Sequence, residues 1–163
     1  MSGTVTNVTI AGLGGQGVLK ASDILSEAAF ACGWDVKKAE IHGMSQRGGS
    51  VNSDVRFGAD GATVASPMIP AGQADYLVVL SADQIDVNRP CLREGGVLIT
   101  PESIDTSALP HPRSLNVALL GVLSTHLPID IEPWMTAVRA NLPEKVHELN
   151  EQAFEMGRQA AAS

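Results

Sequence analysis

The sequence predicts an α/β fold: a single domain with a mainly parallel sheet, helices on both faces, a β-hairpin extension and a helical C-terminal third. Three observations favour this class. A β-branched run ends at a glycine turn that opens an amphipathic helix, later apolar runs have the length of buried strands, and the last third has helical periodicity. A chain of 163 residues can bury a core without disulfides or a structural metal ion, so we expect residues 1–163 to form one domain.

The first elements are a strand, a glycine turn, a helix and a second strand. Residues 5–11 (VTNVTIA) are β-branched and stop at Gly12. In residues 16–33 apolar side chains recur at helical spacing, and Gly33 stands where a helix commonly ends. Residues 34–41 (WDVKKAEI) predict the second strand. This order predicts a right-handed crossover unit whose two strands are adjacent and parallel.

A hairpin is predicted next. Residues 50–58 (SVNSDVRFG) alternate between apolar and polar side chains, as a half-solvated strand does. The turn at residues 58–61 would return the chain through residues 62–66. Residues 50–66 therefore predict an antiparallel β-hairpin near an edge of the sheet.

The rest of the chain predicts two buried strands and a helical end. Near-continuous apolar runs are typical of strands that are covered on both faces. Helical spacing of apolar residues begins near Ser114 and continues to the end. The expected elements are a strand at 75–81, a short helix at 82–94, a strand at 95–101, and helices at 116–127, 132–141 and 143–161.

Composition limits the classes of partner. Apolar residues make up 44% of the chain and charged residues 18%, which favours a globular domain with a face buried against a partner. Eighteen acidic residues against eleven basic ones give a net charge of -7, and the basic residues are scattered. Nucleic acid and anionic membranes are therefore not expected as partners.

The cysteines and the N-terminus indicate the compartment. Cys32 and Cys91 have no neighbouring cysteine or histidine at ligand spacing, so this chain alone is not expected to hold an iron-sulfur cluster or a structural zinc ion. Both are interpreted as small core residues of a reducing compartment. The opening residues MSGTVTNVTIAG lack the pattern of a signal peptide, and we expect a cytoplasmic protein.

The glycine turn GLGGQG (residues 12–17) has two interpretations. Gly12, Gly14 and Gly17 satisfy the dinucleotide fingerprint between a strand and a helix, where backbone N–H groups can meet a phosphate. Glu40 falls near the end of the second strand, where a ribose-binding acid would stand. Against this, too few strands remain for the second half of a dinucleotide fold, and Gln16 adds an amide that pyrophosphate does not require. The glycines can equally serve close packing of strand on helix.

The loop HGMSQRGGS (residues 42–50) also has two interpretations. It is a tight surface turn in which Gly48 and Gly49 supply positive φ, or it is a binding loop. Met44 is costly to expose, and Arg47 can reach an anion or a neighbouring subunit. Because ligands gather at the carboxyl ends of parallel strands, we expect this loop and the glycine turn to line one crevice.

No catalytic or metal-binding set is predicted. His42 has no serine, cysteine or acid within its loop to complete a nucleophilic set, so we interpret it as structural. Asp83 and Asp86 could be a metal pair, but an acidic turn that opens a helix is ordinarily a cap, and we assign no metal.

Taken together, the two loops resemble a known family. GLGGQG and MSQRGG (residues 44–49), with the segments around them, resemble the gamma domain of 2-oxoacid:ferredoxin oxidoreductases. The version with MSQRGG is most similar to the beta subunits of indolepyruvate oxidoreductases, whereas relatives that act on 2-oxoglutarate or pyruvate tend to carry a different loop. Residues 116–158 resemble the family's C-terminal helices.

The resemblance implies one subunit of a heteromeric enzyme that oxidatively decarboxylates a 2-oxoacid, indolepyruvate or another aryl 2-oxoacid, to an acyl-CoA. It implies that thiamine diphosphate and 4Fe-4S clusters lie on alpha-type partner subunits, that coenzyme A is a co-substrate, and that ferredoxin or NAD accepts the electrons. The alternatives are a stand-alone NAD(P)- or flavin-binding module and a scaffold protein without chemistry. The positions that match the family's motifs, and so its expected binding residues, are Gly12, Gly14, Gly15, Gln16, Gly17, Met44, Ser45, Gln46, Arg47, Gly48 and Gly49.

Overall fold

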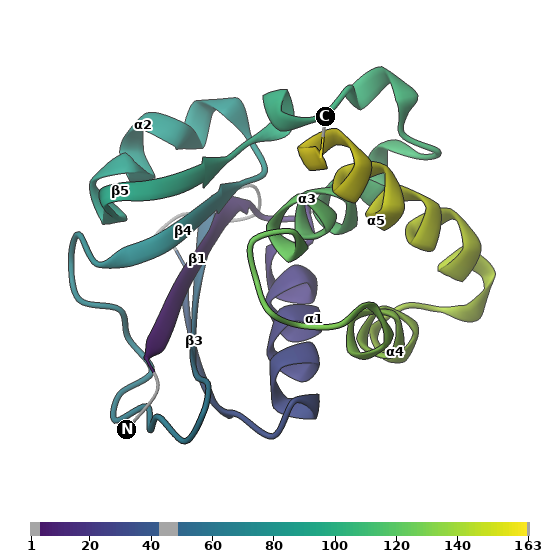
Figure 1. Ribbon diagram of the computed structural model, residues 1–163. Helices are drawn as coiled ribbons and strands as arrows, with labels where there is room; N and C mark the ends of the chain where they lie inside the picture. Colours follow the sequence, from purple (N-terminus) through teal and green to yellow (C-terminus); the bar gives the residue numbers. More distant parts are fainter. Residues whose placement is uncertain (1–3, 43–48, 163) are drawn as a thin grey trace.

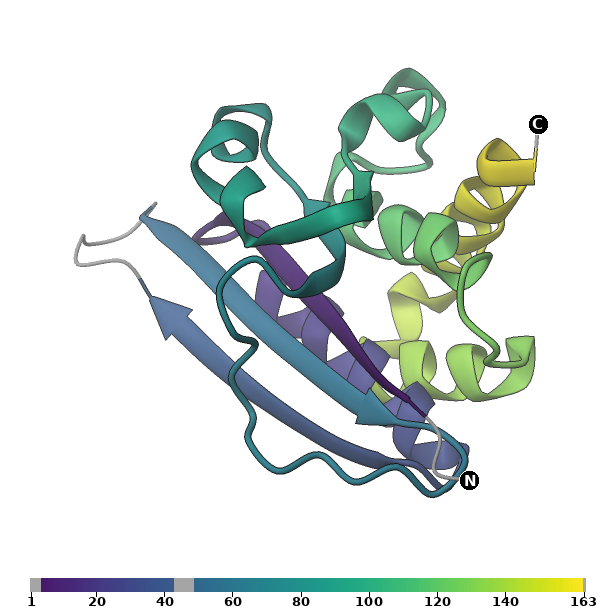
Figure 2. The same ribbon diagram turned by 60° about the vertical axis from the view of Figure 1, so that its left-hand side comes forward.

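The computed structural model describes residues 4–42 and 49–162. Five strands form one sheet in the order β2-β3-β1-β4-β5 (Figures 1 and 2). The strands are β1 (Val5–Leu13), β2 (Asp35–His42), β3 (Ser50–Gly58), β4 (Ala74–Val79) and β5 (Leu92–Ile99). The helices are α1 (Val18–Ala31), α2 (Ile85–Asn88), α3 (Leu115–Ser124), α4 (Ile131–Asn141) and α5 (His147–Ala162).

The predicted fold class is confirmed. Strands β1, β4 and β5 form a parallel half of the sheet, and β3 runs antiparallel to both of its neighbours, so the sheet is mixed. The predicted helices of the C-terminal third correspond to α3, α4 and α5. Gly33 has φ 81, which fits its predicted place at the end of α1.

The predicted strand pairing is wrong in two places. The first and second strands are not adjacent, because β3 lies between β1 and β2 and pairs with both (Figure 2). The hairpin therefore consists of β2 and β3, and residues 62–66 form no strand. The alternation within β3 predicts a strand but cannot tell which strand lies at each of its edges, since that depends on non-local pairing.

The region between β4 and β5 also differs from its prediction. Instead of one helix over 82–94, three short turns follow one another: η1 (Ala82–Gln84), α2 and η2 (Arg89–Cys91). Pro90 lies in the last turn and cannot continue a regular helix. Strand β5 therefore begins at Leu92, three residues earlier than predicted.

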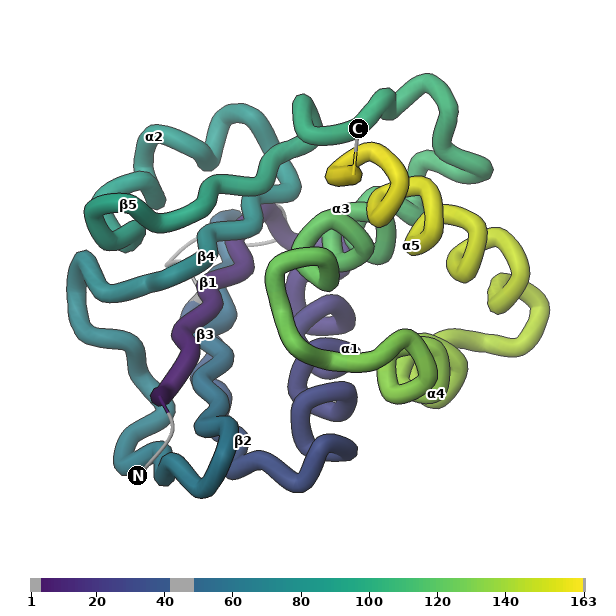
Figure 3. Tube along the Cα trace, in the orientation of Figure 1, coloured from purple at the N-terminus to yellow at the C-terminus, as the bar shows by residue number. Residues whose placement is uncertain are grey.

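Helices cover the two faces of the sheet unequally. Helices α1 and α3 pack on one face, and α4 and α5 lie outside them, as the ribbon and the trace show (Figures 1 and 3). Val8 and Ile10 of β1 point into this main core together with Ile24 of α1. On the opposite face a small cluster centred on Leu77 packs against Ile85 of α2. Within the described residues, no helix is both long and apolar enough to cross a bilayer.

Residues 59–73, here called the strap, cross the second face of the sheet away from α1 (Figure 2). Strand β2 anchors the strap at Val64. The Val64 amide donates to Asp35 Oδ2 at 2.7 Å, and Lys37 Nζ donates to the Val64 carbonyl at 2.6 Å. These bonds satisfy the backbone groups of Val64, which a sheet partner would otherwise have to satisfy.

Strand β3 anchors the strap a second time. The buried Asp54 accepts a hydrogen bond from the Ile69 amide at 3.0 Å and another from Thr9 Oγ1 at 3.1 Å. The Arg56 guanidinium donates to the carbonyls of Ser66 and Met68, at 2.8 and 3.2 Å. Polar side chains on this face of the sheet therefore hold the segment that was predicted to be a returning strand.

The anchor at Asp35 should make the strap sensitive to acid. The Val64 amide, and less strongly the Lys37 ammonium, hold the pKa of Asp35 below its ordinary value of 3.8. A depressed pKa stabilises the fold above the ordinary value, and this contribution is lost as the pH falls through the lower folded value. We expect the amide NMR signal of Val64 to titrate below pH 3.8, and Asp35→Asn to abolish that titration.

A matched control is Asp86→Asn, because the Asp86 side chain is 99% exposed and the change in net charge is the same. This control should leave the Val64 titration unchanged. A Val64 signal that titrates at or above the ordinary aspartate value would contradict the anchor.

Candidate functional site

The glycine turn joins β1 to α1 and requires its glycines for different reasons. Gly15 and Gly17 have φ 89 and 84, in the left-handed region that favours glycine. Gly12 is buried, and a Cβ there would lie 2.8 Å from Gln16 Oε1 and 2.9 Å from Val18 Cγ2. The turn is therefore tight on its inner side at Gly12.

The side chain of Gln16 has a structural role that its sequence position did not reveal. Its Oε1 accepts a hydrogen bond from the Leu13 backbone amide at 2.7 Å, and the backbone amide of Gln16 donates to the Leu13 carbonyl at 3.1 Å. The side-chain amide thus closes the turn from within. This explains the glutamine without assigning it to a ligand.

The two predicted loops meet in the structure. The Gly14 amide donates to the Gly49 carbonyl at 2.9 Å, so the glycine turn touches the end of the loop that leads into β3. The strand register is consistent with this contact, because Leu13 at the end of β1 is opposite Ser50 at the start of β3. Adjacent parallel strands were predicted to bring the loops together, and an antiparallel neighbour does so instead. Met44, Ser45, Gln46, Arg47 and Gly48 lie outside the described residues.

A recess of about 390 Å³ opens beside the glycine turn. It lies between the start of α1 and the segment that precedes α3, which includes η5 (Pro112–Ser114). We call it the glycine recess. Its lining residues are Gly15, Gln16, Gly17, Lys20, Pro112, Arg113, Leu115 and Asn116.

Asn116 was missed by the sequence analysis, although it closes the recess. Its Nδ2 donates to the Gly17 carbonyl at 3.1 Å, across 99 residues of sequence, and its Oδ1 accepts from the Val117 amide at 2.9 Å. Asn116 is 6% exposed, so these bonds satisfy a buried amide. Sequence alone offers only a weak signal, an asparagine at the start of an otherwise apolar helix.

The recess has the chemistry of an anion site. Lys20 and Arg113 line it, both are exposed, and no aspartate or glutamate is among its described lining residues. Its volume lies within the range of small-molecule sites, about 300–1,000 Å³. The start of α1 adds backbone N–H groups and the positive end of a helix dipole. A phosphate or carboxylate would be complementary to this lining.

The described residues offer no metal centre, because they contain no cluster of three or more histidine, cysteine or acidic side chains that could hold an ion. Asp83 and Asp86 lie in the first turns of η1 and α2, where a negative charge suits the start of a helix. Cys32 and Cys91 are free and partly buried, Cys32 packs against the main core, and burial raises the pKa of both thiols.

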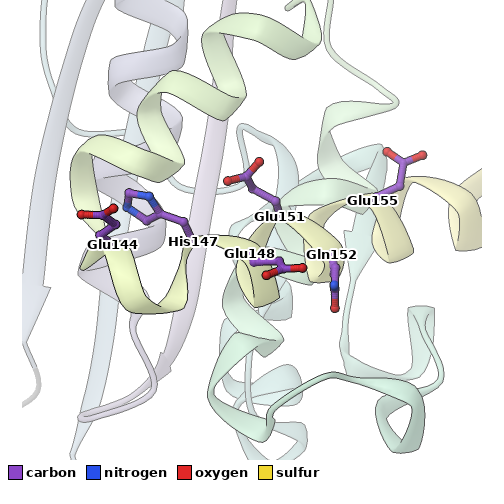
Figure 4. A pocket seen from close by; sticks show the side chains of 6 residues that line it. All are labelled: Glu144, His147, Glu148, Glu151, Gln152 and Glu155. Atoms are coloured by element: carbon purple, nitrogen blue, oxygen red, sulfur yellow. The ribbon is translucent and has the colours of Figure 1, made fainter.

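A larger hollow of about 590 Å³ lies along the start of α5 and η6 (Glu144–Val146), shown in Figure 4. Four glutamates, His147 and Gln152 line it. One of the four, Glu151, already pairs with Arg139 at 2.9 Å, which holds the pKa of Glu151 below its ordinary value. None of the described residues that line this hollow is a predicted site residue.

The dinucleotide interpretation of the glycine turn is not supported. In that fold the ribose-binding acid follows a strand beside β1. Here β3 separates β1 from β2, so Glu40 lies two strands away from the glycine turn and pairs with Lys38 at 3.5 Å. The glycines therefore form a tight turn, and Glu40 does not lie beside it.

The fold and the glycine recess define an α/β domain with a recess lined by two cationic side chains beside its glycine turn and no metal centre among its described residues. Comparison with known proteins gives the family. The pyruvate ferredoxin/flavodoxin oxidoreductase family matches residues 7–160, and the chain belongs to it. It is accordingly a subunit of an oxidoreductase, as the resemblance of its two loops predicted.

Several relatives cover almost the whole chain. Indolepyruvate oxidoreductase subunit IorB of Thermococcus kodakarensis is 32% identical, with 95% of each chain covered. The IorB subunit of Pyrococcus horikoshii is 31% identical over the same shares. The 2-oxoglutarate synthase subunit KorC of Methanocaldococcus jannaschii is 27% identical over 94% of this chain and 92% of its own.

Solved structures agree with this fold. The gamma subunit of a keto/oxoacid ferredoxin oxidoreductase from Geobacter sulfurreducens superposes with a TM-score of 0.80 at 27% identity, covering 96% of this chain and 98% of that one. A 2-oxoglutarate:ferredoxin oxidoreductase from Magnetococcus marinus shares the fold, with a TM-score of 0.83 at 17% identity over 97% of this chain and 31% of that one.

Proposed function

We propose that this chain is the non-thiamine-binding subunit of a 2-oxoacid:ferredoxin oxidoreductase that acts on indolepyruvate or another aryl 2-oxoacid. The observation that carries the proposal is the match to indolepyruvate oxidoreductase subunits along 95% of both chains. The reaction would convert a 2-oxoacid and coenzyme A into an acyl-CoA and carbon dioxide, with two electrons passing to ferredoxin or NAD. An alpha-type partner would carry thiamine diphosphate and 4Fe-4S clusters.

The described residues fit an accessory place in this reaction. They include only two cysteines, whereas a 4Fe-4S cluster ordinarily takes four cysteine ligands. The glycine recess supplies two cations and a helix start, which suit a phosphate of coenzyme A or the carboxylate of a 2-oxoacid. When bound, thiamine diphosphate would supply the carbanion chemistry, and this chain would hold and orient an anionic group beside it.

The glycine turn and the loop over residues 42–49 would share this work. One backbone hydrogen bond joins Gly14 to Gly49 at the end of the second loop, so a single ligand or partner could contact both segments. We propose that Gly12, Gly14, Gly15, Gln16, Gly17, Met44, Ser45, Gln46, Arg47, Gly48 and Gly49 form the binding edge. In this proposal Arg47 contacts an anion, either of the ligand or of the partner subunit.

Arg47→Ala tests this role. We expect the enzyme reconstituted with the variant to lose at least about tenfold in assembly or in coenzyme A-dependent oxidation of indolepyruvate, because a charge-assisted contact contributes roughly 1.5–3 kcal/mol. The melting temperature of the isolated chain should stay at the parent value. The measurements are turnover of the reconstituted enzyme and circular dichroism of the chain.

Arg89→Ala is the matched control, since the Arg89 side chain is 57% exposed and its ion pair with Asp86 is long, at 3.9 Å. It should assemble and turn over like the parent. If Arg47→Ala behaved like this control, the proposed role of Arg47 would be wrong. If the parent chain failed to assemble with a thiamine-binding subunit, the proposed function itself would fail.

A further inference from the structure

A third hollow lies on the opposite face of the sheet from the glycine recess, between the β2–β3 hairpin and α2. Its volume is about 370 Å³, and we call it the α2 hollow. The residues that line it are Ile41, Ser50, Asn52, Asp83, Gln84, Val87 and Asn88. It reaches the proposed binding edge, because Ser50 follows Gly49, whose carbonyl accepts the Gly14 amide.

Two apolar side chains at this hollow are unusually exposed. Ile41 is 43% exposed and Val87 is 67% exposed, and both are among the five large apolar residues that the described part of the chain leaves open to solvent. Exposed aliphatic groups beside a hollow favour contact with another molecule, since covering them removes apolar surface from water.

The polar lining lacks a hydrogen-bond donor at one point. Gln84 Oε1 is buried and has no partner among the described residues. Its neighbours are already engaged: Asn88 Nδ2 donates to the Gln84 carbonyl at 2.8 Å, and Asn88 Oδ1 accepts from Asn52 Nδ2 at 2.7 Å. A buried acceptor without a donor costs free energy, which an incoming N–H group would recover once the Gln84 side chain turns its oxygen toward the hollow.

The charge of the hollow is negative. The Asp83 side chain lines it, accepting one hydrogen bond from Ser81 Oγ at 2.6 Å, and no lysine or arginine is among its described lining residues. This lining disfavours a phosphate and favours a cation. An arginine combines an aliphatic stem with a planar group of five N–H donors, which matches apolar walls, a carboxylate and an unpaired amide oxygen.

We propose that the α2 hollow receives an arginine side chain of the thiamine-binding partner subunit. The stem packs between Ile41 and Val87, and the guanidinium donates to Gln84 Oε1 and to the Asp83 carboxylate. This inference rests on the proposed function, because it requires a heteromeric enzyme. It places a subunit contact at the α2 hollow and the proposed anion site at the glycine recess, on opposite faces of the same sheet end.

The test measures the dissociation constant between this chain and its co-purified thiamine-binding subunit. We expect Asp83→Lys to weaken binding at least about tenfold and to reduce its salt dependence, since the change removes a charge pair. Gln84→Met should weaken binding about tenfold without lowering the melting temperature of the free chain, whose Oε1 has no described bond to lose. Asp86→Lys, on the 99% exposed neighbour, should bind within about twofold of the parent.

The outcomes separate this inference from the proposed function. If the parent chain binds the subunit and Asp83→Lys and Gln84→Met bind equally well, the docking inference is overturned while the proposed function stands. If the parent chain does not bind the subunit, the proposed function is wrong, and the docking inference that rests on it is wrong as well. If the free chain self-associates and Asp83→Lys abolishes this in sedimentation velocity, a second copy occupies the hollow and the inference is likewise overturned.

Discussion

Gly157→Ala should destabilise the chain by about 3 kcal/mol or more, although alanine is the better helix former. Gly157 lies in α5 where this helix packs on α3 (Figure 1). A Cβ at Gly157 would come well within 3.0 Å of the Ala118 carbonyl oxygen, which is backbone and cannot rotate away. The same holds for Gly121 in α3 against the Phe154 carbonyl oxygen. The two helices therefore approach each other through two glycines.

Chemical denaturation of Gly157→Ala and Gly121→Ala measures this effect. Replacing an uncrowded glycine in a helix by alanine would raise the free energy of unfolding by roughly 1 kcal/mol. A decrease would therefore show that the new Cβ is crowded. Gly61→Ala is the control: its φ of 86 is strained for alanine, but a Cβ there meets nothing within 4 Å. It should cost only about 1–2 kcal/mol. A Gly157→Ala variant as stable as the parent would contradict the close packing of α3 on α5.

Gly17→Ala should cost about 2–4 kcal/mol and should open the glycine recess. Two causes add: the φ of 84 is unfavourable for alanine by roughly 1–2 kcal/mol, and a crowded Cβ costs roughly another 1–3 kcal/mol. The crowding comes from Asn116, whose Nδ2 would lie 2.5 Å from the new Cβ. Displacing Asn116 would break its bond to the Gly17 carbonyl, which also accepts the first helical bond of α1 from Ala21.

A double-mutant cycle separates the two causes. Asn116→Ala alone should cost about 1 kcal/mol for the lost hydrogen bond. In the Gly17→Ala/Asn116→Ala double variant the crowding is relieved, so its free energy of unfolding should exceed the value expected from adding the two single changes. Denaturant unfolding of all four proteins measures this coupling. Strict additivity would show that Asn116 does not clamp the turn.

The local elements were largely predictable from the sequence. Helix α1 with its ending glycine, the strand after it and the three C-terminal helices follow from periodicity and from glycine chemistry, which act within a few residues. The glycine turn was identified for the same reason. Gly49 at the end of the second loop meets this turn through an antiparallel neighbour rather than through the predicted parallel pair, and the shared crevice stays a prediction.

What the sequence determined by itself is most of the elements, the family and the two loops at one end of the sheet, because these depend on local spacing. Only the tertiary structure decided that β3 lies between β1 and β2, that the strap crosses the second face, and that Asn116 closes the recess from 99 residues away. In each case a strand edge, a backbone amide or a glycine carbonyl could pair with several partners in the chain. Packing between residues far apart in the sequence selects the partner, and local sequence patterns carry no information about it.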